Sequence, residues 1–353
     1  MRSFNDSRDV PRSKGHTPSA GEHAYRRAAF HVLLIVAIIA ACALSVMFGA
    51  RPVGLDDVIR AFSDASADDI AAEAIQLRVP RTVLGLLVGA ALGVAGALMQ
   101  GVMRNPLADP SILGLNSGAA FAIVCSIAFA GLSTPRQYIW VALLGASLTA
   151  VLVWLVGSVG RSGPTPLKLT LAGAVISSAL ASLTSAILLP RVDVISTYRF
   201  WQVGGLSGGR FELMAPILPL FAIGFILALW SARHLNALAL GDQLAAGLGV
   251  SMTRVRVLAW AAAVLLSASS TALAGPIGFV GLVVPHAARL VVGPDYRRII
   301  TASMLMGPLL MVAADVIGRV VTRPDDVEVG IVTALIGAPV FVMLVRGSKV
   351  REV

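Results

Sequence analysis

The chain has 353 residues, of which 57% are hydrophobic and only 13% are charged, and its formal net charge at pH 7 is +9. About a quarter of the residues in soluble domains are charged, so this composition excludes a water-soluble globular protein. The basic residues are scattered at the ends of apolar runs, which indicates membrane topology and not nucleic-acid binding.

The apolar residues form long unbroken runs, which predict spanning helices and not the alternating strands of a transmembrane barrel. A helix needs about 20 predominantly apolar residues to cross a bilayer. By this length the sequence predicts ten spans, at residues 30–49, 83–103, 111–131, 137–157, 167–189, 213–231, 255–274, 277–292, 300–320 and 330–345. The expected fold class is therefore an all-α polytopic membrane protein.

The ends of the chain are polar, and we expect them to lie outside the membrane. Residues 1–28 carry two prolines and no apolar period, which predicts a disordered cytoplasmic tail. Residues 29–346 are expected to form one ten-helix transmembrane domain, and residues 347–353 a second cytoplasmic tail. Alternation from a cytoplasmic N-terminus puts more Lys and Arg on the cytoplasmic side, as the positive-inside rule expects. Two long connections, 51–79 and 190–212, then lie at the outer face.

Ionisable residues are missing from the middle of the five predicted spans between residues 83 and 231. Secondary transporters and proton pumps depend on such residues. Only Asp315 and His286, in later spans, come close to such a position. Arg319 follows Asp315 by four residues. On a helix the two share a face, so we expect them to pair near the outer end of their span. A role for Asp315 as an ion-coupling site stays open as the alternative.

The sequence contains no HExxH motif, no paired carboxylates at catalytic spacing and no GxxxxGK[ST] phosphate-binding loop. We therefore expect no catalytic residue, no metal site and no cofactor on this chain. If ATP drives the protein, another subunit binds the ATP and its Mg.

Four local patterns go beyond hydrophobicity. In the first, residues 77–81 (Leu-Arg-Val-Pro-Arg) lead into a span with glycines at steps of about four residues, which allow close helix approach. These glycines are Gly85, Gly89, Gly93 and Gly96. The turn that follows, 105–110, contains Asn-Pro and Asp-Pro pairs, and Asp109 is expected to cap the next helix.

The second pattern, residues 238–250, predicts a short amphipathic helix on the cytoplasmic side that offers a contact to a partner. The alternative is a helix lying on the bilayer, but its polar face lacks the Lys and Arg that bind lipid headgroups. The third and fourth patterns, 274–286 and 314–341, place glycines and prolines inside spans. Such breaks are tolerated where helices line a cavity or pack against neighbours, and both suit a translocation pathway.

With these motifs in this order, residues 30–345 closely resemble the FecCD-type permease family, the membrane subunits of bacterial ABC importers for ferric siderophores, haem and cobalamin. The resemblance implies the type II ABC importer fold, a permease domain over residues 29–346 and a place in the bacterial inner membrane with both termini cytoplasmic. It also implies the partners: a second copy or a paralogous permease, two cytoplasmic ATPase subunits and an extracytoplasmic substrate-binding protein.

The resemblance also assigns roles to particular residues. It places Arg78, Arg81 and Arg319 on a basic rim that receives carboxylates of the binding protein, a role that suits the guanidinium fork, although arginines at span ends also simply snorkel. It places Asn105 and Leu107 at the inner gate. Thr165 joins them, in a turn (164–168) that departs from the family pattern. The expected ATPase-coupling residues are Leu240, Gly241, Asp242, Ala246, Gly247 and Gly249.

The expected substrate is a ferric siderophore complex. Residues 105–110, 198–201 and 293–295 look more like the siderophore members of the family than the cobalamin members. Cobalamin or haem is the alternative within the family, and an ion-coupled secondary transporter is the alternative from another class.

Overall fold

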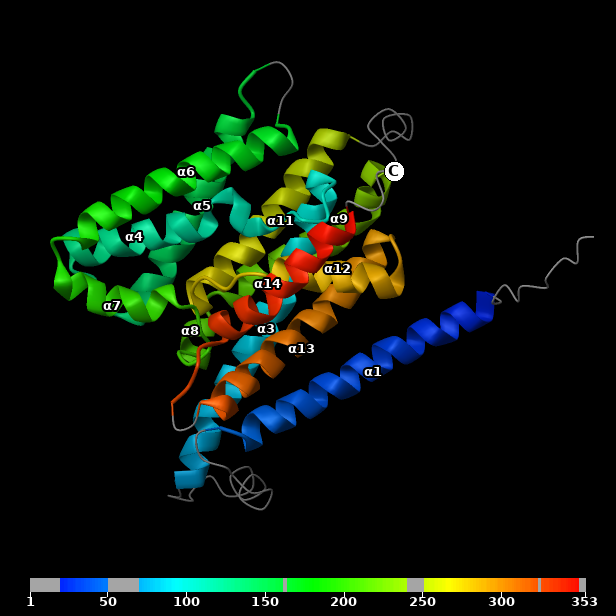
Figure 1. The fold of residues 1–353 in the computed structure, drawn as a ribbon, viewed down its shortest axis with the longest axis horizontal. Helices are drawn as coiled ribbons and strands as arrows, with labels where there is room; N and C mark the ends of the chain where they lie inside the picture. Colours follow the sequence, from blue (N-terminus) through cyan, green and yellow to red (C-terminus); the bar gives the residue numbers. More distant parts are fainter. Residues whose placement is uncertain (1–19, 50–69, 161–163, 240–250, 323–324, 349–353) are drawn as a thin grey trace, which may run out of the picture.

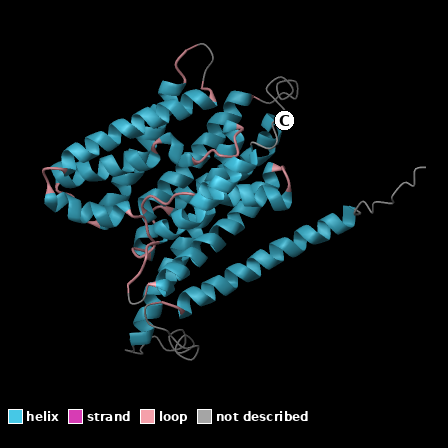
Figure 2. Cartoon of the chain, in the orientation of Figure 1, coloured by secondary structure: helices cyan, strands magenta, loops and turns pink. Residues whose placement is uncertain are grey.

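The computed structural model describes residues 20–49, 70–160, 164–239, 251–322 and 325–348. All regular secondary structure within these ranges is helical (Figure 2), which confirms the predicted all-α class. The helices, in chain order, are α1 (Ala20–Met47), α3 (Ile70–Met103), the 3₁₀ turn η1 (Pro110–Leu113), α4 (Leu115–Ala130), α5 (Pro135–Gly157), α6 (Pro166–Leu188), α7 (Val192–Gln202), α8 (Phe211–Met214), α9 (Leu218–Ala239), α11 (Met252–Ala274), α12 (Val280–Val292), α13 (Tyr296–Val321) and α14 (Val329–Ser348).

Ten of these helices correspond to the ten predicted spans. Among the described residues, seven are long and apolar enough to cross a membrane: α1, α3, α5, α6, α9, α11 and α13. Three shorter apolar helices, α4, α12 and α14, complete the set. Hydropathy therefore located every apolar helix that the described residues form.

The starts of α1 and α3 were predicted less well. Helix α1 begins at Ala20, so the last part of the expected disordered tail, residues 20–28, is helical. Helix α3 begins at Ile70, inside the expected outer connection, and continues through Pro80. Both early segments are rich in Ala, Glu, Arg or Gln, which favour helix although they are not apolar. Helix α7 also lies in an expected connection, 190–212.

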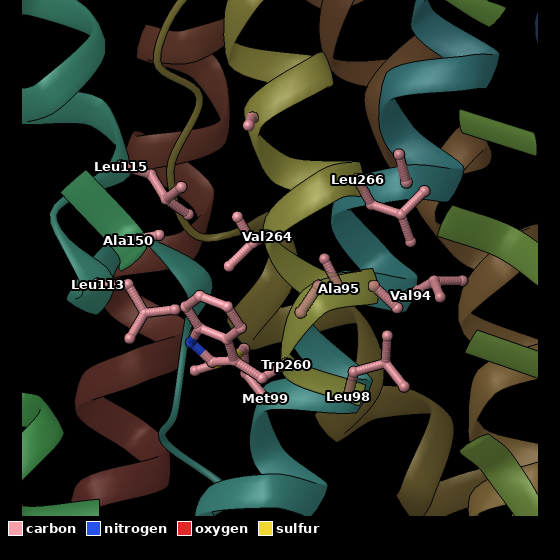
Figure 3. Packing of buried hydrophobic residues seen from close by; sticks show 14 of the residues in the cluster. Val94, Ala95, Leu98, Met99, Leu113, Leu115, Ala150, Trp260, Val264 and Leu266 are labelled. Atoms are coloured by element: carbon pink, nitrogen blue, oxygen red, sulfur yellow. The ribbon is translucent and has the colours of Figure 1, made fainter. Parts of the chain in front are cut away.

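Helix α3 is the centre of the bundle. Most of its apolar span is buried, and it packs against α13, α11, α12 and α9. Figure 3 shows Ala95, Leu98 and Met99 of α3 beside Trp260 and Val264 of α11 in this core. Helix α1 lies at one edge (Figure 1), where it packs on α13 and α3. Much of the apolar surface of α1, α5 and α6 is exposed and is free to face lipid or another subunit.

The glycines of α3 allow two neighbouring helices to approach closely. A Cβ on Gly89 would lie 2.5 Å from the carbonyl oxygen of Gly307 in α13, and a Cβ on Gly96 would overlap the carbonyl of Gly281 in α12. The close approach expected from the glycine spacing is thus confirmed. Its partners are α13 and α12, which follow about 200 residues later in the chain.

Replacing Gly89 by Ala tests this packing. The added methyl group forces α3 and α13 apart, and overpacking of this kind costs about 1–3 kcal/mol. We expect Gly89→Ala to lower the thermal unfolding temperature of the purified protein. Gly208→Ala is the control, because a Cβ there meets nothing within 4 Å. Equal unfolding temperatures for the two variants would contradict the close approach.

Candidate functional site

A buried charge cluster lies where α1 and α13 end and α3 begins, and we call this the charged end of the bundle. Asp315 of α13 is at its centre, with its side chain only 2% exposed. Its Oδ1 accepts hydrogen bonds from Arg81 Nε at 3.0 Å and Arg81 Nη2 at 2.8 Å. Its Oδ2 lies 2.9 Å from Arg319 Nη2. The predicted pairing of Asp315 with Arg319 is confirmed, and Arg81 is a second cation on the same carboxylate.

Arg81 has another carboxylate partner nearer the surface. Its Nη1 donates to Asp326 Oδ2 at 2.8 Å. Asp326 lies in the segment between α13 and α14, and its side chain is 31% exposed. Arg81 therefore connects a buried carboxylate to one that water reaches.

Arg319 also holds the end of α1. Its Nη1 donates to the carbonyl oxygens of Ser45 at 2.9 Å and Phe48 at 3.1 Å, and its Nη2 donates to Ser45 Oγ at 2.6 Å. Ser45 Oγ in turn lies 2.7 Å from Thr82 Oγ1 of α3. Arg319 thus binds a carboxylate of its own helix and the C-terminal carbonyls of another.

Arg78 of α3 also binds the C-terminal end of α1. Its Nη1 donates to the carbonyl oxygens of Val46 at 2.9 Å and Met47 at 3.2 Å. The last four carbonyls of a helix have no intrahelical donor, and cations near that end are favourable. Two arginines from α3 and α13 therefore satisfy the end of α1 and fix it to the bundle.

The structure brings the three predicted rim arginines together in one cluster, which also contains Asp315 and Asp326. Among the described residues, this cluster consists of three guanidinium groups and two carboxylates. All three arginines are largely buried. Sequence reasoning missed Ser45, Thr82 and Asp326, because contacts across α1, α3 and the segment after α13 leave no local pattern. The docking role of the arginines stays a prediction.

Two of the predicted gate residues, Asn105 and Leu107, lie in the turn that follows α3. Asn105 Oδ1 accepts a hydrogen bond from Leu107 N at 2.9 Å, so the side chain stabilises the turn. In the same turn Asp109 Oδ1 accepts from Ser111 N at 2.8 Å and caps η1, as expected.

The third gate residue, Thr165, lies at the N-cap of α6, where its hydroxyl accepts from Lys168 N at 3.4 Å. The turn that contains Asn105 and the N-cap of α6 belong to separate elements. The turn leads into η1, and η1 packs against α6. A role of these residues in gating stays a prediction.

The predicted coupling residues, 240–249, lie outside the described residues. Their neighbours form a clamp at the end of the bundle opposite the cluster: Asn236 Nδ2 of α9 donates to Asp295 Oδ1 at 2.9 Å, and Asn236 Oδ1 accepts from Tyr296 N at 2.8 Å. Burial raises the pKa of the Asp295 carboxyl, but hydrogen bonds from Asn236 and from the Arg297 N–H outweigh it and hold the pKa below its ordinary value. The clamp fixes the end of α9 to the start of α13.

The charge cluster can be tested by removing its central carboxylate. Asp315→Asn keeps the shape of the side chain but leaves two buried guanidinium groups without their shared counter-charge, a change that typically costs about 3–5 kcal/mol. We expect a large drop in thermal unfolding temperature. Asp325→Asn removes the same charge from an exposed side chain and should change stability by less than about 0.5 kcal/mol. If both variants unfold alike, Asp315 does not hold the cluster together.

Comparison with known proteins agrees with this architecture. The profile of the FecCD transport family matches residues 34–347. The ferric enterobactin transport system permease FepD of Escherichia coli is 41% identical over 327 residues, which are 93% of this chain and 98% of that protein. The cobalamin import system permease BtuC of Halobacterium salinarum is 41% identical over 276 residues, 78% of this chain and 73% of that protein. A solved metal-chelate type ABC transporter in an inward-facing conformation superposes with a TM-score of 0.78 at 27% identity, over 92% of this chain and 99% of that one. The chain belongs to the FecCD transport family.

Proposed function

We propose that this chain is the permease subunit of an ABC importer that carries a ferric siderophore across the bacterial inner membrane. The observation that carries the proposal is the extent of the match: the family profile runs from within α1 to the end of α14, and the similarity to the enterobactin permease covers nearly that protein's whole length. The permease would act as a dimer with a second copy or with a paralogue. An extracytoplasmic protein would deliver the substrate.

The siderophore is preferred to cobalamin for two reasons. The enterobactin and cobalamin permeases are equally identical to this chain, but the enterobactin match covers 93% of the chain and the cobalamin match only 78%. The solved relative is of the metal-chelate type. The transport experiment described below distinguishes a ferric siderophore from cobalamin and haem as the substrate.

Energy from ATP fits the chain better than energy from an ion gradient. A coupling carboxylate has to exchange its ion during transport. Asp315, the candidate, is instead buried and bound by two guanidinium groups. Two cytoplasmic ATPases would therefore bind ATP and Mg, and we place their contact on residues 240–250, which follow the clamped end of α9.

The exposed face of α6 supplies an uncharged surface that suits a translocation pathway. Its hydroxyls bond to carbonyls of their own helix, from Ser182 Oγ to Ser178 O at 2.9 Å and from Ser185 Oγ to Ala181 O at 3.0 Å. Such hydroxyls need no partner outside the helix, yet their oxygens can still accept weak hydrogen bonds. A surface of this kind lets a polar chelate pass without holding it tightly.

We infer the orientation of the chain in the membrane from the distribution of its Lys and Arg residues. The start of α1 and the end of α14 both lie away from the charged end (Figure 1). We place these termini in the cytoplasm, as the positive-inside rule favours, so that the charged end faces the binding protein.

Reconstituted vesicles test the transport proposal. They contain the permease, its ATPase and its binding protein, with ATP trapped on the ATPase side and no ion gradient. We expect ATP-dependent uptake of a ferric siderophore and little uptake of cobalamin or haem. Gradient-driven uptake by the permease alone, without an effect of ATP, would contradict the proposal.

The docking role of the rim is tested by Arg81→Gln, which removes the charge of the arginine that contacts both Asp315 and Asp326. Loss of a charge-assisted contact to a carboxylate should weaken docking of the binding protein at least about tenfold at low salt, where electrostatic attraction is least screened. Copurification of the ATPase checks that the permease still assembles.

Arg136→Gln is the matched control for this experiment. Arg136 is exposed in the first turn of α5, and its loss changes the net charge by the same amount. We expect less than about a twofold effect there. Equal affinities for the wild type and Arg81→Gln would remove Arg81 from the docking surface.

A further inference from the structure

The two carboxylates on Arg81 differ in how firmly they are held. Asp315 binds two nitrogens of Arg81 and one of Arg319, and it is buried. Among the described residues, Asp326 has one direct cation contact, to Arg81 Nη1 at 2.8 Å, and almost a third of its side chain is exposed. Removing Asp315 would leave buried charges unpaired, whereas water can solvate the Asp326 carboxylate as it leaves.

The backbone around Asp326 is held independently of this ion pair. Val327 N donates to the carbonyl oxygen of Gly318 at 3.2 Å. Glu328 Oε1 accepts a hydrogen bond from Ser207 Oγ at 2.7 Å. The side chain of Asp326 can therefore swing away from Arg81 while the segment keeps its place at the start of α14.

Arg81 Nη1, the nitrogen that Asp326 would leave, suits another carboxylate. With Asp326 displaced, Arg81 keeps the contacts of its Nε and Nη2 with Asp315, and its Nη1 loses a carboxylate partner. Arg81 stays fixed by Asp315 and presents Nη1 at the site that Asp326 occupied. A preorganised guanidinium nitrogen favours a carboxylate over a neutral acceptor.

We propose that Asp326 is an internal stand-in for a docking partner: it occupies Arg81 Nη1 in the undocked permease and gives way to a carboxylate of an acidic protein surface. This rests on the proposed function, in which that partner is the substrate-binding protein. The exchange keeps Arg81 neutralised between docking events. It also weakens docking, because the incoming carboxylate has to compete with one that is already present.

Removing the Asp326 carboxylate, which competes with the partner's carboxylate for Arg81 Nη1, should therefore strengthen docking. Asp326→Asn keeps the size of the side chain and removes its charge. We expect the binding protein to bind the permease–ATPase complex in nanodiscs roughly three- to tenfold more tightly, because the binding-competent state no longer requires displacement of a carboxylate. Thermal unfolding of the same samples checks that the variant is folded.

Asp325→Asn is the control for net charge. Asp325 is the neighbouring residue, is exposed, and carries the same charge. We expect it to change the affinity by less than about twofold, since it acts only through the general field. The gain from Asp326→Asn should also vanish when Arg81 is replaced by Gln, because both effects act through one nitrogen.

Three results would overturn the inference. Equal affinities for the Asp325→Asn and Asp326→Asn complexes would show that only net charge matters. Weaker docking of Asp326→Asn would show that Asp326 supports the docked state. A gain that persists in the Arg81→Gln background would place the effect elsewhere. Absence of docking by the wild-type complex would instead contradict the proposed function itself, and the inference with it.

Discussion

Asp315 is a carboxylate buried within a helix of membrane-spanning length, and the arrangement of the charged end follows from the need to neutralise it. A buried carboxylate requires cations and hydrogen bonds, and here two guanidinium groups provide both. Those groups have further donors to satisfy. Arg319 Nη1 donates to the last turn of α1, and Arg81 Nη1 donates to Asp326. One buried charge thus joins α1, α3, α13 and the segment before α14.

This concentration of charge at one end separates the tasks of the protein. In the proposed function, recognition of an acidic partner belongs to the charged end, whereas the exposed face of α6 carries hydroxyls that bond to their own helix. A substrate that moves along such a surface meets few strong contacts and is released easily. In the proposed function, separate ATPases supply the energy for this movement.

Local patterns in the sequence predicted what local physics controls. Hydropathy located the ten apolar helices, and the spacing of Asp315 and Arg319 predicted their contact on one helix face. The glycines of α3 predicted a close approach but not the helix that makes it. Contacts between distant segments, such as those of Arg81 with Asp315 and Asp326, were missed, since they depend on how α3 packs against α13. The early starts of α1 and α3 were missed because hydropathy ignores helix propensity.

In the proposed docking site, Asp315 is a fixed anchor and the outer contact of Arg81 is exchangeable. The most direct measurement is an experimental structure of the complete transporter with its binding protein docked. The account predicts that Asp315 still binds Arg81 and Arg319, that Asp326 has left Arg81 Nη1, and that a carboxylate of the binding protein has taken its place. An intact contact between Arg81 and Asp326 in the docked complex, with the partner's carboxylates bound elsewhere, would contradict it.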